Sequence, residues 1–147
     1  MCSKRMFLCG FFINLLAVNV FGLPIIQWLP ETLEWHENPK LHGLQTSILF
    51  GNPTLPESYV ERIRIPANFK LQPHSHQDEG RRVTILSGTL YYAFGKTFNV
   101  SQLKMLPAGS FFTEPKATPH YAETREQEVI LQLDAIGPTS TEYSSSE

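Results

Sequence analysis

The feature that most constrains this chain is a series of short apolar segments separated by turn residues. Tyr59–Ile65 alternates apolar and charged side chains with period two, and Arg82–Leu86 is rich in β-branched residues. Ser87-Gly88 separates that second run from a third over Thr89–Phe94. Short strands at this spacing, divided by glycine and proline turns, predict an all-β sandwich or closed barrel and not a parallel α/β sheet. Further strands are expected over residues 46–50 and 128–133.

The first 22 residues have the pattern of a secretory signal peptide and are set aside from the fold. Lys4 and Arg5 give a positive start, residues 6–21 are almost wholly apolar, and Gly22 is a small residue at the expected cleavage point. The apolar run is shorter than the roughly 20 residues of a comfortable membrane span. We expect a secreted or periplasmic protein without stable membrane association after cleavage. An uncleaved anchor is the alternative.

Loss of this leader changes the chemistry that is available to the rest of the chain. Both cysteines, Cys2 and Cys9, leave with it, so no thiolate remains for a metal site or a disulfide. The leader holds two of the 12 basic residues and none of the 14 acidic ones, which leaves a net charge of −4. A nucleic-acid partner is not expected, because binding phosphates requires a basic face.

The remaining residues have the length of one domain, with a segment on each side of it. Residues 23–44 contain two tryptophans and few strand signals, and we expect them to form an arm that packs on the barrel. The barrel itself is expected over 45–137. Residues 138–147 are polar and low in complexity, which predicts a flexible tail. An arm exchanged between two barrels would also make a homodimer.

The candidate chemistry lies in the run Leu71–Glu79, which contains His74 and His76. Residues i and i+2 of a strand share one face, so the two imidazoles are able to converge on a single metal ion. A third histidine, His120, follows far downstream in a second patterned segment. Without that second segment, His74 and His76 would most simply be exposed histidines on a strand edge.

These histidines and the residues around them resemble the two motifs of the cupin family, G-x5-H-x-H-x3,4-E-x6-G and G-x5-P-x-G-x2-H-x3-N. Gly88 supplies the closing glycine of the first motif, and Asn68, which tolerates positive φ, stands at its opening glycine. Gly109 and Pro115 have the spacing of the second motif, and His120 falls at its histidine. Two positions of the second motif differ, with Ala117 for glycine and Thr124 for asparagine.

This resemblance covers about residues 45–137 and implies a single-domain jelly-roll barrel that holds one divalent transition metal ion, Fe, Mn, Ni or Zn. The implied ligands are His74, His76 and His120. At the position of the family's glutamate the chain has Arg81, which cannot ligate a metal. Glu79, two residues earlier, becomes the fourth ligand if a bulge near Gly80 turns it inward. The other interpretation is a three-histidine site that favours an anionic ligand in the fourth position.

The implied function is a metal-dependent dioxygenase or isomerase that acts on a small oxygenated molecule. Arg81 would orient an anionic substrate, and Tyr91 or Tyr121 would line the pocket; no catalytic residue can be singled out. One alternative is a non-catalytic cupin that binds a sugar or a small organic acid. Another is a structural barrel in which a metal ion only stabilises the fold. The candidate side chains also have simpler interpretations, as loop carboxylates, solvated charges or core residues.

Overall fold

The computed structural model describes residues 22–144. Residues 1–21 of the expected signal peptide and residues 145–147 of the expected tail lie outside the described part. Among the described residues, no helix has the length and hydropathy that a membrane crossing requires. The strands are β1 (His36–Glu37), β2 (Gln45–Phe50), β3 (Ser58–Ile65), β4 (Lys70–His76), β5 (Glu79–Ser87), β6 (Thr89–Phe94), β7 (Lys104–Pro107), β8 (Phe111–Glu114), β9 (His120–Glu123), β10 (Val129–Ile136) and β11 (Thr141–Tyr143), with two short 3₁₀ turns, η1 (Pro30–Thr32) and η2 (Val100–Gln102).

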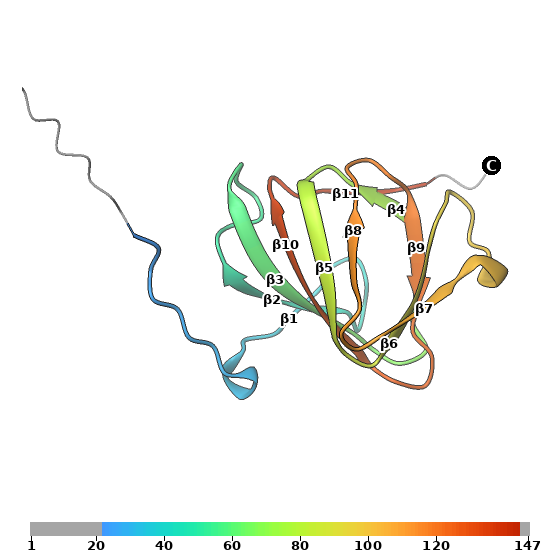
Figure 1. The fold of residues 1–147 in the computed structure, drawn as a ribbon, viewed down its shortest axis with the longest axis horizontal. Helices are drawn as coiled ribbons and strands as arrows, with labels where there is room; N and C mark the ends of the chain where they lie inside the picture. Colours follow the sequence, from blue (N-terminus) through green and yellow to red (C-terminus); the bar gives the residue numbers. More distant parts are fainter. Residues whose placement is uncertain (1–21, 145–147) are drawn as a thin grey trace, which may run out of the picture.

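The strands form two antiparallel sheets that face each other, as Figure 1 shows. One sheet has the order β1-β2-β3-β10-β5-β8 and the other has the order β11-β4-β9-β6-β7. Neighbours in each sheet are mostly far apart in sequence, which is the arrangement of a jelly roll. The prediction of an all-β jelly-roll barrel is confirmed.

The core lies between the sheets and follows the period of two seen in the sequence. In β10, Val129, Leu131, Leu133 and Ala135 are buried, while the residues between them are only partly covered. The same alternation in β5 buries Val83 and Ile85, together with a charged residue, Arg81. Arg81 therefore points into the barrel with the apolar side chains.

Tight turns position the strands that carry the histidines. Gly88 has φ 74°, and an added Cβ there would lie 2.2 Å from the carbonyl oxygen of Glu128. Only glycine fits at such a close approach. Asn68 and Ala117, which stand where the family motifs have glycine, also adopt positive φ, 56° and 54°. Both turns thus adopt the positive φ that favours glycine, although neither residue is a glycine.

The two flanking segments differ from what their sequences predict. The Trp28 Nε1–H donates to the carbonyl of Leu49, and β1 pairs with β2, but Leu23 and Ile25 are exposed on an arm that leaves the barrel beside these strands (Figure 1). Residues 138–144 are not a flexible tail, because β11 pairs with β4 directly beside the histidines. The polar residues of β11 form backbone hydrogen bonds to a sheet edge, which requires no apolar pattern.

Candidate metal centre

Three histidine side chains meet inside the barrel and form the histidine cluster (His74, His76 and His120). His74 and His76 come from β4 and His120 from β9, and Cα pairing places His74 directly opposite His120. The ring centroids are 4.5–5.2 Å apart, and one potential ligand atom from each ring lies within 4.8 Å of the other two. This spacing allows one ion to be held by all three imidazoles.

Each ring is held from outside by a backbone carbonyl. Nδ1 lies 2.6 Å from the carbonyl of Gln72 in His74, 3.0 Å from that of Thr118 in His120, and 3.2 Å from that of Ser140 in His76. Since a carbonyl only accepts, Nδ1 must carry the proton and donate it. Nε2 is left as the unprotonated nitrogen of each ring, which is the arrangement that outer hydrogen bonds give to metal-binding histidines.

Burial keeps two of these rings neutral. Desolvation is the largest cause that lowers the pKa of His74 to about 4. Desolvation, followed by the nearby Arg81 guanidinium, lowers the pKa of His76 to about 3. Neutral imidazole is the form that binds a metal ion, so these two ligands are available at neutral pH.

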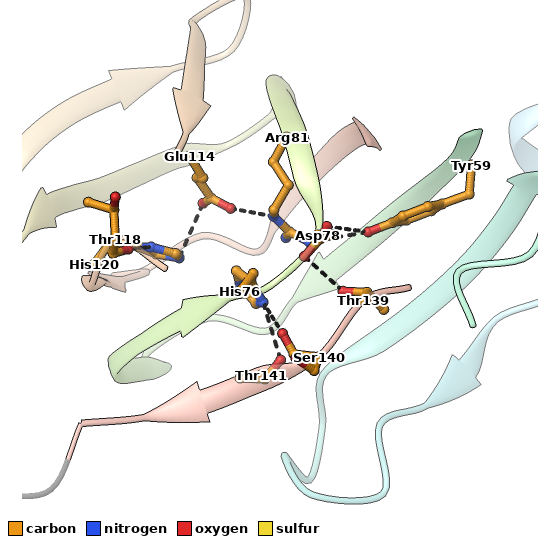
Figure 2. A network of polar contacts seen from close by, with 10 residues as sticks. All are labelled: Tyr59, His76, Asp78, Arg81, Glu114, Thr118, His120, Thr139, Ser140 and Thr141. Carbon is orange, nitrogen blue, oxygen red and sulfur yellow. Dashed lines mark hydrogen bonds and ion pairs between the residues drawn. The ribbon is translucent and has the colours of Figure 1, made fainter. Parts of the chain in front are cut away.

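A buried ionic group, the arginine network (Tyr59, Asp78, Arg81 and Glu114), lies beside the cluster. Asp78 comes from the turn between β4 and β5, and the other three residues come from the opposite sheet. Arg81 donates from Nε to Glu114 at 2.7 Å and from Nη1 to Asp78 at 2.9 Å. The Tyr59 hydroxyl donates to Asp78 at 2.7 Å. Figure 2 shows these contacts as one chain that leads from Tyr59 to His120.

The network carries one net negative charge next to the histidine cluster. Burial alone would raise the pKa of Glu114, but the neighbouring Arg81 guanidinium holds it below its ordinary value. The two buried carboxylates in turn raise the pKa of Arg81 against its desolvation. Glu114 reaches the cluster directly, with Oε1 3.4 Å from Nε2 of His120.

A cavity of about 380 Å³ opens onto both groups, a size typical of small-molecule sites. Its wall combines aliphatic side chains with polar and charged ones, and Thr139, Ser140, Thr141 and Tyr143 are part of it. The Tyr92 hydroxyl is buried in this wall without a hydrogen-bond partner in the described part of the chain. Burial, and then the Glu114 carboxylate, raise its pKa, although that carboxylate lies outside hydrogen-bonding geometry. An unpartnered buried hydroxyl facing a cavity is suited to bind a ligand.

Comparison with known proteins supports the architecture alone. No family model and no curated protein matches the chain. Among solved structures, the polyketide cyclase RemF from Streptomyces resistomycificus superposes with a TM-score of 0.67 at 14% identity, covering 84% of this chain and 88% of that chain. An RmlC-like cupin from Shewanella frigidimarina gives 0.57 at 20% identity, with 74% and 87% covered. The chain has the cupin fold.

A third structure, the DMSP lyase DddQ from Ruegeria pomeroyi, has a TM-score of 0.62 at 16% identity. The match covers 80% of this chain and 64% of the lyase, so the chain spans less than two thirds of that protein's length. At these identities the shared property is the cupin barrel, and the reaction of each neighbour belongs to that neighbour.

Arg81 and Glu79, the two residues considered for the glutamate of the cupin motif, point in different directions. Arg81 points into the barrel, as the family's glutamate is expected to. Glu79 does not join the histidine cluster: its side chain is 67% exposed and pairs with Lys116 at 3.1 Å. Gly80 at φ 64° and a register shift between β5 and β10 break the regular alternation, so Glu79 and Arg81 no longer share a face.

The two tyrosines expected in the cupin pocket also lie elsewhere. Tyr121 is adjacent to His120 on β9, so its side chain points to the opposite face, where its hydroxyl donates to the carbonyl of Asn99. The ring of Tyr91 packs under the Arg125 guanidinium, 3.7 Å from its centroid. Neither tyrosine is part of the cavity wall.

Sequence reasoning missed Tyr92 and Glu114. For Tyr92 a signal was present, because the alternation of β6 places it on the same face as Leu90. For Glu114 the only signal was a glutamate at the end of a short strand. Its role depends on pairing with Arg81, which is 33 residues away in sequence and is its direct Cα partner between β5 and β8.

Proposed function

We propose that this chain is a metal-dependent cupin enzyme that acts on a small oxygenated molecule. The observation that carries the proposal is the convergence of His74, His76 and His120, each with Nδ1 hydrogen-bonded outward to a backbone carbonyl. Hydrogen bonds to a backbone carbonyl are common for buried histidines. The distinguishing feature is that these three rings also bring one potential ligand atom each within 4.8 Å of the other two. The donor set of neutral nitrogens suits one divalent ion of Fe, Mn, Ni or Zn.

The charges around the cluster suit a ligand with one negative charge. A divalent metal ion held by the three histidines would polarise a carbonyl oxygen or bind dioxygen. The two positive charges of the metal ion, together with the single net negative charge of the arginine network, leave one positive charge at the cavity. An enolate or a carboxylate would balance it. Arg81 itself is already paired with two carboxylates, so we assign it to charge balance and not to direct substrate binding.

The remaining cavity residues would hold the body of the substrate. The aliphatic part of the wall, including Ile63, Leu90 and Leu131, favours a molecule with an apolar body. The Tyr92 hydroxyl is placed to donate a hydrogen bond to it. Glu61 also lines the cavity, and burial raises its pKa. We propose dioxygenation or isomerisation as the reaction class.

Metal analysis of the purified protein tests the proposal. We expect close to one equivalent of a divalent transition metal after reconstitution, and its loss in His74→Ala and His120→Ala. The matched control is His42→Ala, because His42 is 98% exposed and lies outside the cluster. A wild-type protein that takes up no metal, or a His42→Ala variant that loses as much as the cluster variants, would refute the proposal.

A thermal-shift screen separates an enzyme from a non-catalytic binding protein. For an enzyme of this kind, stabilisation by organic acids or enolisable carbonyl compounds should disappear when a chelator removes the metal. Stabilisation by a sugar or an organic acid that a chelator leaves unchanged would favour the binding function.

We also propose that the protein is secreted or periplasmic and forms a homodimer. Residues 1–22 support export, and the exposed apolar side chains of Leu23 and Ile25 support contact with a second copy. N-terminal sequencing of the protein recovered from its host tests the first proposal, with cleavage after about Gly22 expected. Sedimentation analysis tests the second, and a monomer at micromolar concentration would contradict it.

A further inference from the structure

The charged residues of the barrel suggest an unusual source for the fourth ligand of the histidine cluster. In the cupin motif the acidic ligand would come from the position of Arg81 on β5. Here the carboxylate stands on the next strand, because Glu114 of β8 is the direct Cα partner of Arg81. The two residues form a buried ion pair at 2.7 Å, so the chain has an arginine where the motif has an acid and an acid on the neighbouring strand.

The distance from Glu114 to His120 fits coordination of one ion by both residues, while the mutually close group of ligand atoms contains the three histidines alone. Metal–nitrogen and metal–oxygen bonds of about 2.0–2.2 Å place two neighbouring ligand atoms of a tetrahedral ion roughly 3.4 Å apart. Oε1 of Glu114 lies 3.4 Å from Nε2 of His120. Figure 2 shows the carboxylate between His120 and Arg81, with one oxygen directed to each.

The two oxygens of Glu114 have different surroundings. Oε2 accepts the hydrogen bond from Arg81 Nε, which fixes the orientation of the carboxylate. Oε1 faces Nε2 of His120, and in the neutral ring whose Nδ1 donates to Thr118 this Nε2 presents a lone pair. Two acceptor atoms at this distance repel each other unless a cation or a proton lies between them. A metal ion bound by His120 would satisfy both atoms.

We propose that Glu114 is the fourth protein ligand of the metal ion, oriented by Arg81, and that it replaces the acidic ligand missing from the first motif. This inference rests on the proposed function, since it requires a metal ion at the histidine cluster. With Glu114 bound, three imidazoles and one carboxylate hold the ion, and Tyr92 beside them is left to meet the substrate.

Cobalt titration of the purified protein tests the proposal, because the visible absorption of Co²⁺ reports the number and type of its ligands. Glu114→Gln should weaken Co²⁺ binding by at least about 100-fold, as loss of even an outer-shell partner costs 10–100-fold. It should also change the absorption spectrum. Glu79→Gln, which removes an exposed carboxylate, should change neither.

A second variant guards against misfolding, since Glu114→Gln leaves Arg81 with one buried partner fewer. Glu114→Asp keeps the charge beside Arg81 but shortens the side chain by one methylene, and it should shift the spectrum as well. An unchanged Co²⁺ spectrum in folded Glu114→Gln would overturn the role of Glu114 as a ligand, even if affinity falls. In that case the wild-type protein would still bind Co²⁺, whereas failure of the proposed function would abolish binding in the wild type.

Discussion

The histidine cluster and the arginine network are neighbours inside the barrel but satisfy their polar atoms in opposite ways. In the cluster, each ring uses Nδ1 for a backbone carbonyl and presents Nε2 to the cavity. In the network, Arg81, Asp78 and Tyr59 are bonded to one another. Groups that are satisfied within the protein stabilise the fold, and groups with an unused donor or acceptor are available to a ligand.

Removing Arg81 should cause the largest loss of stability. Arg81→Met would leave Asp78 and Glu114 as unpaired buried carboxylates, and breaking a buried ion pair in this way costs about 3–5 kcal/mol. Urea unfolding of the metal-free protein measures it. Arg82→Met is the control, because Arg82 makes an exposed ion pair with Asp134 that should contribute less than about 1 kcal/mol. Equal losses in both variants would show that the network is not needed for stability.

Acidification should destabilise the metal-free protein through the histidine cluster. The pKa of His74 is about 4 in the folded protein, against 6.5 as the ordinary value. The unfolded state therefore binds more protons between these values, and stability is lost as the pH falls from about 6.5 toward 4. His74 alone would contribute on the order of 3 kcal/mol, at about 1.4 kcal/mol per pKa unit.

Denaturant unfolding as a function of pH checks this expectation. His74→Gln should reduce the slope between pH 6.5 and 4 and leave the part due to His76, whose pKa is about 3, and His42→Gln on the surface should leave the profile unchanged. A wild-type profile without slope in this window would mean that the cluster is protonated without cost in the folded state.

Two buried tyrosine hydroxyls provide a direct test of the comparison. Tyr59→Phe removes a hydroxyl that donates to Asp78 and should cost about 1–3 kcal/mol in unfolding free energy. Tyr92→Phe removes an unpartnered hydroxyl and should leave stability equal or slightly higher. Its effect should appear in ligand affinity or turnover instead. If Tyr92→Phe is the more destabilising of the two, the assignment of the Tyr59 hydroxyl to stability and of the Tyr92 hydroxyl to ligand binding is wrong.

The smallest effect is expected in the turn between β8 and β9, which joins the network to the cluster. Ala117 has φ 54°, a region that disfavours every residue with a Cβ except a few polar ones. Ala117→Gly should therefore stabilise the protein by about 1 kcal/mol. Gly109→Ala is the inverse control, because Gly109 has φ 87° and free space for a Cβ, so strain alone should destabilise it. Thermal unfolding measures both shifts.

Local patterns predicted the fold well, because strand alternation and turn residues act over a few positions. The run Thr89–Phe94 was expected as a strand and is β6. The convergence of His74, His76 and His120 followed from two spaced motifs. The positions of Glu79, Tyr91 and Tyr121 did not follow, since one irregular residue or one step along a strand moves a side chain to the other face.

The sequence by itself determined the class of fold and the three imidazoles, because period-two alternation and motif spacing are properties of short segments. Only the tertiary structure decided what surrounds them. Arg81 meets Glu114 across a gap of 33 residues, and Ser140, in a segment expected to be a tail, holds His76 across 64. These partners come from strands joined by sheet pairing, and no local pattern records which strands become neighbours. The charge, hydrogen bonding and proposed fourth ligand of the centre depend on that pairing.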